Sequence, residues 1–308
     1  MNKIIVTGAS GMIGSDLIDI AIRKNIEVLA LVRKNTKKIK NIPKNDLVKV
    51  IECDIDEIKS LPQMIKNTKY DIFYHFAWCA TSPFSRDDIN EQLNNIVYSL
   101  DAIKVAAKLG CKKFVFAGSQ AEYGLHNEPL RCDTNESPLN GYGIAKNTVT
   151  KFGRILANQL GIDFCSGRIL SAYGIKDNSY TMISTLINKI NIGEDMKISP
   201  CTQIWDYINS KDVANAFYLI GEKGVNGKAY PIASGEGRPL KYYVETIYRL
   251  LDGKGRNVKL NYGSIPPKKN AVTYLVGDIS ELTKDTGFVP RISFEEGIKE
   301  IIKGMGNE

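Results

Sequence analysis

The sequence predicts an α/β protein built on a doubly wound parallel sheet, with a smaller C-terminal α+β region. Three observations support this prediction. Apolar runs of strand length alternate with helix-period segments through the first half of the chain, an alternation typical of parallel sheets. A glycine-rich turn, "TGASGMIG" at residues 7–14, separates the first run from the first helical segment. After about residue 173, helices divided by short strands and Gly- and Pro-containing loops replace the alternation.

Six apolar runs in the first half have the length of buried strands. They are Ile4–Thr7, Val28–Val32, Leu47–Glu52, Ile72–Phe76, Phe114–Ala117 and Phe164–Ile169. The clearest helix between them covers residues 90–109, because apolar side chains recur on one of its faces. Gly110 follows this segment, as is common after a helix C-terminus.

The glycine-rich turn has the spacing Gly8-x-x-Gly11-x-x-Gly14 between a predicted strand and a predicted helix. In such a turn the first glycine permits a sharp bend, the second lets the backbone approach a pyrophosphate, and the third lets the helix pack on the strand. The helix N-terminus adds free N–H groups and a positive dipole end. The turn therefore predicts a dinucleotide site.

The chain is predicted to divide near residue 173. Residues 1–173 form the dinucleotide-binding domain, and residues 174–308 form a smaller region over the sheet edge, with some strands and helices crossing between them. Helices are expected in the second region near residues 179–192, 211–222, 239–252 and 293–303.

Composition limits the classes of function. The 308 residues are 43% hydrophobic and 24% charged, as in an ordinary globular protein. Six cysteines without a CxxC pair indicate free thiols, and two histidines exclude a His-rich metal site, so no metal is expected. No apolar run approaches the roughly 20 residues of a membrane span. Without a signal-peptide pattern, a cytoplasmic location away from membranes is expected.

The net charge of +7 lies partly in two basic stretches. These are "RKNTKKIKNIPK" at residues 33–44 and "PPKKN" at residues 266–270. Neither interleaves aromatic side chains, so no nucleic-acid partner is expected. Two explanations stay open: solvated loops, or cations that face the phosphates of a small anionic ligand.

The second strand ends in Val32 and Arg33, where the adenine ribose of a dinucleotide would lie. NAD-selective sites place Asp or Glu there to bind the 2′-hydroxyl. Positions 30–34 hold no acidic residue, and a guanidinium suits a 2′-phosphate in charge and geometry. The sequence therefore favours NADP, with NAD as the alternative.

Three residues form the predicted catalytic group. Tyr142 and Lys146 are spaced i,i+4, so they share one face of the helix after the fifth strand. A phenol with its usual pKa of about 10 is a poor base, but a nearby ammonium lowers that pKa. Ser119 ends the fifth strand, where its hydroxyl can donate to a reacting oxygen; the alternative for Ser119 is a helix or turn cap.

The glycine spacing, Ser119 and the Tyr142/Lys146 pair together resemble the extended branch of the short-chain dehydrogenase/reductase superfamily, specifically the NAD-dependent epimerase/dehydratase family acting on nucleotide sugars. The resemblance covers nearly the whole chain. It includes "HFAW" (75–78), Asn95, "RILSAYG" (168–174), "WDYINSKDVANA" (205–216) and "YLVGDISELTKDTGFVPRISFEEGIKE" (274–300).

The resemblance implies a Rossmann fold, a nucleotide-diphosphate sugar as substrate and a larger set of site residues. The implied cofactor-binding residues are Gly8, Ser10, Gly11, Met12, Ile13, Gly14, Arg33, Asp54, Ile55, Phe76, Ala77, Trp78, Asn95, Ala117, Tyr142, Lys146 and Ile169, with Asp54 on the adenine. The implied substrate-binding residues are Cys79, Ser119, Gln120, Ala121, Tyr142, Ser171, Trp205 and Lys268.

Departures from the family pattern narrow the reaction. An Asp-Glu pair follows the catalytic Thr of the family's 4,6-dehydratases, whereas Gln120 and Ala121 follow Ser119 and can do no acid–base work. Dehydration is therefore disfavoured. In addition, Trp205 and Ser171 stand where many members have Arg and Asn, and Lys268 or Lys269 stands near a common Arg.

Hydride transfer at one sugar carbon remains, and the resemblance implies C4. Arg33 favours a 4-keto reductase that uses NADPH, with a 4-epimerase holding NAD tightly as the alternative. A non-catalytic cofactor sensor is less favoured, because Ser119, Tyr142 and Lys146 are all kept.

The family's assembly also implies a homodimer. It would form through the helices at residues 90–109 and 142–160. Leu93, Leu100, Ile144 and Phe152 are the candidate contacts, and packing against the sheet is the alternative for each.

Overall fold

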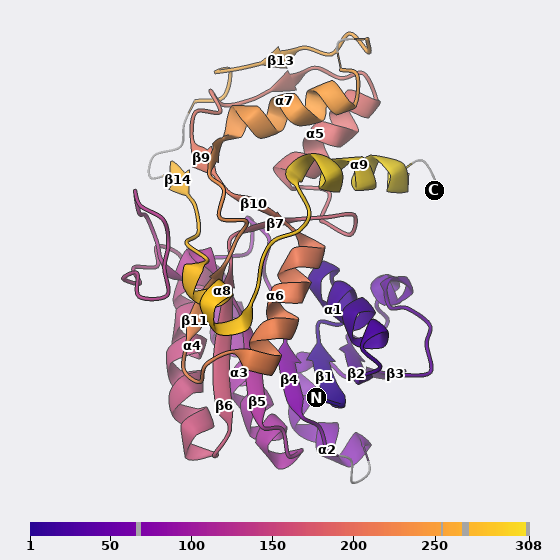
Figure 1. Ribbon diagram of the computed structural model, residues 1–308, viewed down its shortest axis with the longest axis vertical. Helices are drawn as coiled ribbons and strands as arrows, with labels where there is room; N and C mark the ends of the chain where they lie inside the picture. Colours follow the sequence, from indigo (N-terminus) through magenta and orange to yellow (C-terminus); the bar gives the residue numbers. More distant parts are fainter. Residues whose placement is uncertain (66–68, 254, 267–270, 306–308) are drawn as a thin grey trace.

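The computed structural model describes residues 1–65, 69–253, 255–266 and 271–305. A seven-stranded parallel sheet in the order β11-β6-β5-β4-β1-β2-β3 forms its centre (Figure 1). The strands are β1 (Lys3–Thr7), β2 (Glu27–Val32), β3 (Val48–Glu52), β4 (Ile72–His75), β5 (Lys113–Ser119), β6 (Asp163–Ile169) and β11 (Ala229–Ile232). All six runs predicted as strands lie in this sheet, so the predicted fold class is confirmed.

The sheet is buried on both faces, which explains why its strands are almost continuously apolar. Successive side chains point to opposite faces of a strand. In β1, Ile4 and Val6 accordingly join one hydrophobic core while Ile5 joins the other, and all three are fully buried. Polar ligand-binding groups must therefore lie at the strand ends.

Two layers of helices cover the sheet (Figure 1). The core on one face includes residues of α1, α6 and α8, and the core on the other includes residues of α2, α3 and α4. The bounds are α1 (Met12–Arg23), α2 (Leu61–Met64), α3 (Ile89–Lys108), α4 (Gly141–Gln159), α6 (Ser210–Lys223) and α8 (Ser280–Thr286). Asn140 begins α4 by accepting the Gly143 N–H at 2.8 Å, as an N-cap residue does.

Two elements from beyond residue 173 complete the sheet layers. The helix α6 packs against α1, and β11 pairs with β6. Elements that follow residue 173 in the chain therefore belong to the sheet and its helix layers. The sequence did not predict β11, because its four residues contain Pro231, which lacks an N–H for the ladder. The structure places β11 at the sheet edge, where proline is tolerated.

The remaining elements gather above the sheet (Figure 1). They comprise α5 (Met182–Asn191), α7 (Leu240–Leu250) and α9 (Phe294–Met305), with the short strands β7 (Ser171–Tyr173), β8 (Met196–Lys197), β9 (Ile204–Trp205), β10 (Tyr207–Asn209), β12 (Arg238–Pro239), β13 (Leu260–Asn261) and β14 (Tyr274–Leu275). The three helices share their own core, in which the ring centroid of Phe294 lies 4.6 Å from that of Tyr243 and 5.1 Å from that of Tyr173.

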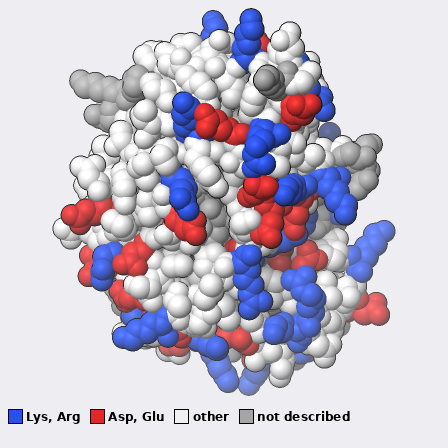
Figure 2. Space-filling view, turned by 45° about the horizontal axis from the view of Figure 1, so that its top comes forward, with Lys and Arg blue, Asp and Glu red and all other residues white. Residues whose placement is uncertain are grey.

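Acidic and basic side chains are interspersed on the face shown in Figure 2. Exposed ion pairs of the chain include Lys211–Glu300 and Arg249–Glu295, both at 2.7 Å. The positive charge is thus not collected into one uniform stripe on this face. Within the described ranges, no helix has both the length and the hydropathy that crossing a membrane requires.

Candidate active site

Thr7 joins the two central strands where the strand order reverses. Its hydroxyl lies 3.0 Å from Nδ1 of His75 on β4, and its Oγ1 accepts the N–H groups of Phe76 and Ala77, both at 3.1 Å. The other ring nitrogen of His75 lies 3.1 Å from the Ser99 hydroxyl. Burial lowers the pKa of His75 to about 3, so the ring is a neutral structural link between β1, β4 and α3.

The turn after Thr7 requires glycine for steric reasons. Gly8 has a φ of +63°, and a Cβ there would lie 2.8 Å from the backbone of Phe76 and Ala77. A Cβ on Gly14 would lie 2.4 Å from the carbonyl oxygen of Gly8. The backbone of the turn is therefore pressed directly against β4 and the first turn of α1, as in a pyrophosphate-binding turn.

The N-terminus of α1 offers free hydrogen-bond donors. Gly11 is the N-cap and brings no side chain to cap the helix. Within the turn, Gly11 donates to Gly8 and Ser15 donates to Gly11, both at 3.0 Å. The N–H groups of Met12, Ile13 and Gly14 have no acceptor within the helix, because they belong to its first turn. These groups fit the phosphates of a dinucleotide.

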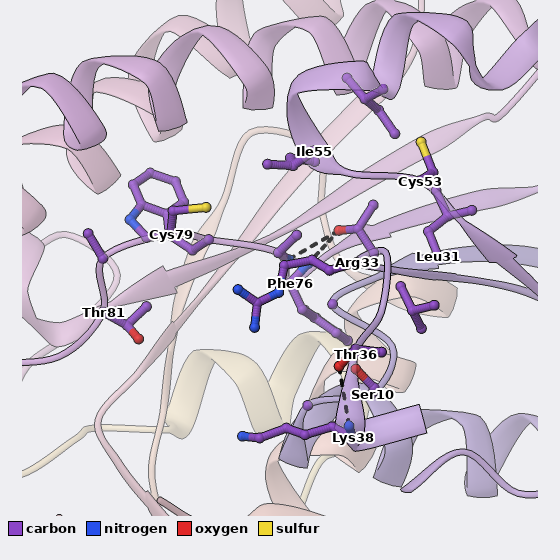
Figure 3. Close-up of a pocket in the computed structure, with 18 of the residues that line it drawn as sticks. Ser10, Leu31, Arg33, Thr36, Lys38, Cys53, Ile55, Phe76, Cys79 and Thr81 are labelled. Carbon is purple, nitrogen blue, oxygen red and sulfur yellow. Dashed lines mark hydrogen bonds between the residues drawn. The ribbon is translucent and has the colours of Figure 1, made fainter. Parts of the chain in front are cut away.

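A cavity of about 390 Å³ opens beside this turn (Figure 3). Its lining includes the predicted cofactor-site residues Gly8, Ser10, Gly11, Arg33, Ile55, Phe76, Ala77 and Trp78, and the predicted substrate-site residue Cys79. It also includes Thr36, Lys38, Thr81 and Asn178, which the sequence analysis did not identify. Lys38 belongs to the basic stretch at residues 33–44. That stretch indicated that cations of this segment could face an anionic ligand, but not which ones.

Three polar side chains of one loop enter this cavity. Figure 3 shows the side chains of Arg33 and Lys38 extending into it in the same direction, with Thr36 close to Lys38. Arg33 is exposed and forms no ion pair with any described residue. Lys38 Nζ lies 3.5 Å from Oδ1 of Asn178, which comes from the C-terminal region. An anion in the cavity would therefore meet an uncommitted guanidinium and an ammonium.

Neighbouring charges in this loop are already engaged. Lys34 pairs with Glu57 at 2.7 Å, and its N–H donates to Oδ1 of Asp54 at 3.1 Å. Asp54, predicted to bind adenine, thus supports the backbone beside Arg33, and the flanking Cys53 and Ile55 line the cavity. The adenine role of Asp54 stays a prediction.

The three predicted catalytic residues come from β5 and the start of α4. Ser119 ends β5, and its Oγ accepts the Ala121 N–H at 3.2 Å within a short 3₁₀ turn, Gln120–Glu122. Tyr142 lies in the first turn of α4, and Lys146 lies one turn later and donates to the Ala117 carbonyl at 2.7 Å. Tyr142 and Lys146 are both buried.

Trp78 connects the cavity to these residues. Its ring lies 3.7 Å from Lys146 Nζ and 6.0 Å from the ring of Tyr142. The indole N–H donates to Gln92 at 3.0 Å, which fixes the ring. Asn95 is buried and exchanges two hydrogen bonds with the backbone of Cys79, so it supports the cavity wall from behind.

The protonation of the Tyr142/Lys146 pair differs from the expectation. Burial raises the pKa of Tyr142, while the charge of Arg86 and hydrogen bonding to Ser119 act to lower it. Lys146 does not produce the expected lowering, because burial also lowers its own pKa, to about 7. Its Nζ is 5.7 Å from the Tyr142 ring centroid and only 3.7 Å from that of Trp78.

Arg86 is a cation that the sequence analysis missed. Its guanidinium carbon lies 4.9 Å from the centroid of the Tyr142 ring, and its Nε donates to the Thr81 carbonyl. Its neighbour Asp87 accepts the Gly141 N–H at 2.8 Å and so ties this loop to the start of α4. No motif pointed to Arg86, because the contact depends on how the loop folds back.

The other predicted residues lie around the end of the sheet. Ile169 ends β6 and Ser171 begins β7, two residues further on. Trp205 lines a second, largely apolar hollow of about 510 Å³ between α5 and α7. Lys268 lies outside the described residues. Among those described, no group of three or more His, Cys, Asp or Glu residues could hold a metal ion.

This fold and glycine turn are typical of enzymes that bind a dinucleotide at the switch point of a parallel sheet. A model of the family described as "NAD dependent epimerase/dehydratase family" matches residues 4–233. The chain belongs to this family, and the predicted family and enzyme class are confirmed.

Two curated relatives match nearly the whole chain. The dTDP-4-dehydro-6-deoxyglucose reductase of Escherichia coli is 26% identical, over 99% of this chain and 98% of that protein. The CDP-abequose synthase of Salmonella typhimurium is 25% identical, over 98% of each. Among solved structures, the UDP-glucose 4-epimerase of Thermotoga maritima, with UDP-glucose, aligns with a TM-score of 0.88 at 23% identity, over 99% of each chain, which shows the shared fold.

The buried Lys146 predicts a specific pH dependence of stability. The pKa of Lys146 is about 7 in the folded protein, against 10.5 for a free side chain. Between these values the unfolded chain binds more protons, so this group makes the folded state more stable as pH rises. We therefore compare the free energy of unfolding of Lys146→Met with that of the wild type. The difference, variant minus wild type, should be highest near about pH 6 and should fall by on the order of 2–4 kcal/mol towards about pH 10.

Urea unfolding of the cofactor-free protein at several pH values measures this difference. Lys108→Met, which removes an exposed lysine of α3, is the control and should track the wild type. Parallel pH profiles for Lys146→Met and wild type would contradict the prediction.

Proposed function

We propose that this chain is an NADPH-dependent reductase acting at C4 of a nucleotide-activated 4-keto sugar. The arrangement around one cavity carries the proposal. Arg33, Thr36 and Lys38 form a cationic, hydrogen-bonding lining beside the glycine turn. Trp78, which lines the same cavity, packs on Lys146 and Tyr142. The similarity to the E. coli reductase supports the same reaction class.

The chain's own residues would control the oxygen and its proton. A bound nicotinamide nucleotide supplies the hydride for the sugar carbon. Tyr142 donates its phenolic proton to the carbonyl oxygen as that oxygen becomes a hydroxyl, and the raised pKa of Tyr142 keeps this proton in place beforehand. Ser119 donates a hydrogen bond to the same oxygen, and Lys146 holds the Ala117 carbonyl at the end of β5.

The nucleotide part of the substrate would use the C-terminal region. The apolar hollow lined by Trp205, Leu186 and Val244 suits the flat face of a base. Ser171, at the start of β7, would face the sugar. Gln120 and Ala121 supply no acid or base, which supports reduction over dehydration. Such an enzyme would draw on cytoplasmic pools of its substrates, and the six free cysteines fit that compartment.

A 4-epimerase that holds NAD tightly is the second candidate. The close structural similarity to a UDP-glucose 4-epimerase favours it. The two candidates differ in stoichiometry, because a reductase oxidises one cofactor for each product, whereas an epimerase returns its cofactor unchanged. Free Arg33 beside the ribose site favours the reductase.

Substitution of Tyr142 tests the proposed reaction. With NADPH and dTDP-4-dehydro-6-deoxyglucose, the wild type should oxidise one cofactor for each sugar reduced. Tyr142→Phe should bind NADPH normally and lower kcat by roughly 10²–10⁴-fold, because the proton donor is lost. Tyr242→Phe, on an exposed tyrosine of α7, is the control. Interconversion of UDP-glucose without net cofactor oxidation would identify the epimerase instead.

Cofactor choice is tested at Arg33. A charge-assisted hydrogen bond contributes about 1.5–3 kcal/mol, so Arg33→Asp should weaken NADPH binding by roughly 10- to 100-fold and leave NADH binding nearly unchanged. Lys34→Gln is the matched control, because Lys34 is already paired with Glu57. Fluorescence titration with both cofactors measures the ratio. A wild type that prefers NADH would contradict the assignment.

We also propose that the chain forms a homodimer through α3 and α4. Exposed apolar side chains on these two helices support it: Ile89, Leu93, Val97, Ile144, Phe152 and Ile155 are each more than half exposed. Of the four candidate contacts, Leu93, Ile144 and Phe152 are available, whereas Leu100 packs partly against the sheet core. An apolar face shared by two helices is typical of an association surface.

Phe152→Glu should convert a dimer to a monomer at micromolar concentration, because it places a charge in the apolar face. Light scattering measures the mass. Ile192→Glu is the control, since Ile192 is 72% exposed but lies at the end of α5, away from this face. A monomeric wild type would overturn the proposal.

A further inference from the structure

A cluster of buried charges lies directly behind Ser119. Glu122 and Arg168 are both fully buried and pair through Glu122 Oε2 and Arg168 Nε at 2.9 Å. Arg168 also pairs with Glu136, whose other oxygen is 3.0 Å from Lys151 Nζ. Neither the site described above nor the proposed reaction uses this cluster.

The Glu122 carboxylate contacts three different elements. Its Oε1 accepts the backbone N–H of Ser119 at the end of β5, at 2.8 Å. Its Oε2 accepts the hydroxyl of Thr150 on α4 at 3.0 Å and the guanidinium of Arg168 on β6. The helix α4 also carries Tyr142 and Lys146. The Glu122 carboxylate therefore connects Ser119, the last residue of β5, with the helix that carries Tyr142.

The close packing leaves this carboxylate little freedom. A Cβ on Gly118 would lie 2.5 Å from Glu122 Oε1 and 3.1 Å from Arg168 Cγ. The ring of Tyr123 covers the guanidinium, with 4.5 Å from its centroid to Arg168 Cζ. Glu122 is therefore held on several sides, and with no exposed surface it does not reach a substrate.

The same contacts determine which way the Ser119 hydroxyl can donate. Ser119 Oγ accepts the Ala121 N–H, while the Ser119 N–H is committed to Glu122, as in a capping box. With an oxygen lone pair directed at Ala121, the O–H hydrogen is left for an acceptor outside the turn.

We propose that Glu122 is a positioning residue for the reaction, because its carboxylate fixes the Ser119 hydroxyl relative to the Tyr142 phenol by joining β5 to α4. This inference rests on the proposed function, in which both hydroxyls act on one substrate oxygen. Misplacement of a reacting group by about 1 Å costs up to roughly 10²-fold in rate.

Glu122→Gln tests the proposal with little change in size. An amide cannot keep all three contacts of the carboxylate: with its oxygen on the Ser119 N–H its nitrogen can still donate to the Thr150 hydroxyl but meets the Arg168 guanidinium donor to donor, and in the other orientation it loses the Ser119 N–H. We expect kcat for NADPH-dependent reduction of dTDP-4-dehydro-6-deoxyglucose to fall by about 10- to 100-fold, with the Kd for NADPH within about twofold of wild type.

Glu136→Gln is the matched control. It removes the other carboxylate partner of Arg168 but touches neither Ser119 nor Thr150 among the described contacts. Its kcat should stay within about twofold of wild type. If both Glu→Gln variants lower kcat equally, the buried ion cluster has a general structural role and the proposal fails.

A double mutant separates positioning from other effects. In a Ser119→Ala background, Glu122→Gln should cause no further loss of kcat, because the hydroxyl that it positions is absent. A multiplicative further loss would overturn the proposal. An unaffected Ser119→Ala enzyme would instead overturn the proposed role of Ser119, so the two failures are distinguishable.

Thr150→Val decides the question if Glu122→Gln does not fold. It removes only the hydrogen bond between α4 and the Glu122 carboxylate and should lower kcat several-fold. Thr148→Val is its control, because that hydroxyl bonds to the Ile144 carbonyl within the same helix. Wild-type kcat in Thr150→Val would overturn the proposal.

Discussion

The hydrogen bonds of Thr7 hold the active region together at the centre of the sheet. One hydroxyl oxygen contacts His75 and accepts two backbone N–H groups just beyond β4. This fixes the end of β4 against the end of β1, so Gly8 can turn in direct contact with Phe76 and Ala77. The cavity beside the glycine turn, Trp78 in its lining and the contact of Lys146 with that ring all depend on this junction.

Much of the fold could be predicted because its signals are local. The strand runs and the helices at α3 and α4 follow from hydrophobic period, and Ser119, Tyr142 and Lys146 stand at recognisable element ends. The edge strand β11 was missed because Pro231 contradicts a strand in general but not at an edge. Lys38 and Asn178 are 140 residues apart and meet only through tertiary folding, so no sequence spacing could predict their contact.

The charge state of the site could not be read from residue spacing either. An i,i+4 Tyr–Lys pair predicts a lowered phenol pKa, but burial acts on both groups and favours their neutral forms. Glu122 illustrates the same limit. In the sequence, Glu122 follows Gln120 and Ala121, which stand where the dehydratases have an acidic pair. In the structure, its carboxylate accepts hydrogen bonds from Ser119, Thr150 and Arg168.

The late position of α6 and β11 in the chain affects how the protein is made. Until residue 232 has left the ribosome, β6 is an unpaired edge, and the sheet face that α6 covers is open to solvent. An open strand edge beside exposed apolar surface is the usual starting point for aggregation. The glycine turn is synthesised first, yet the core on its side of the sheet is complete only after α8, near the end of the chain, has emerged.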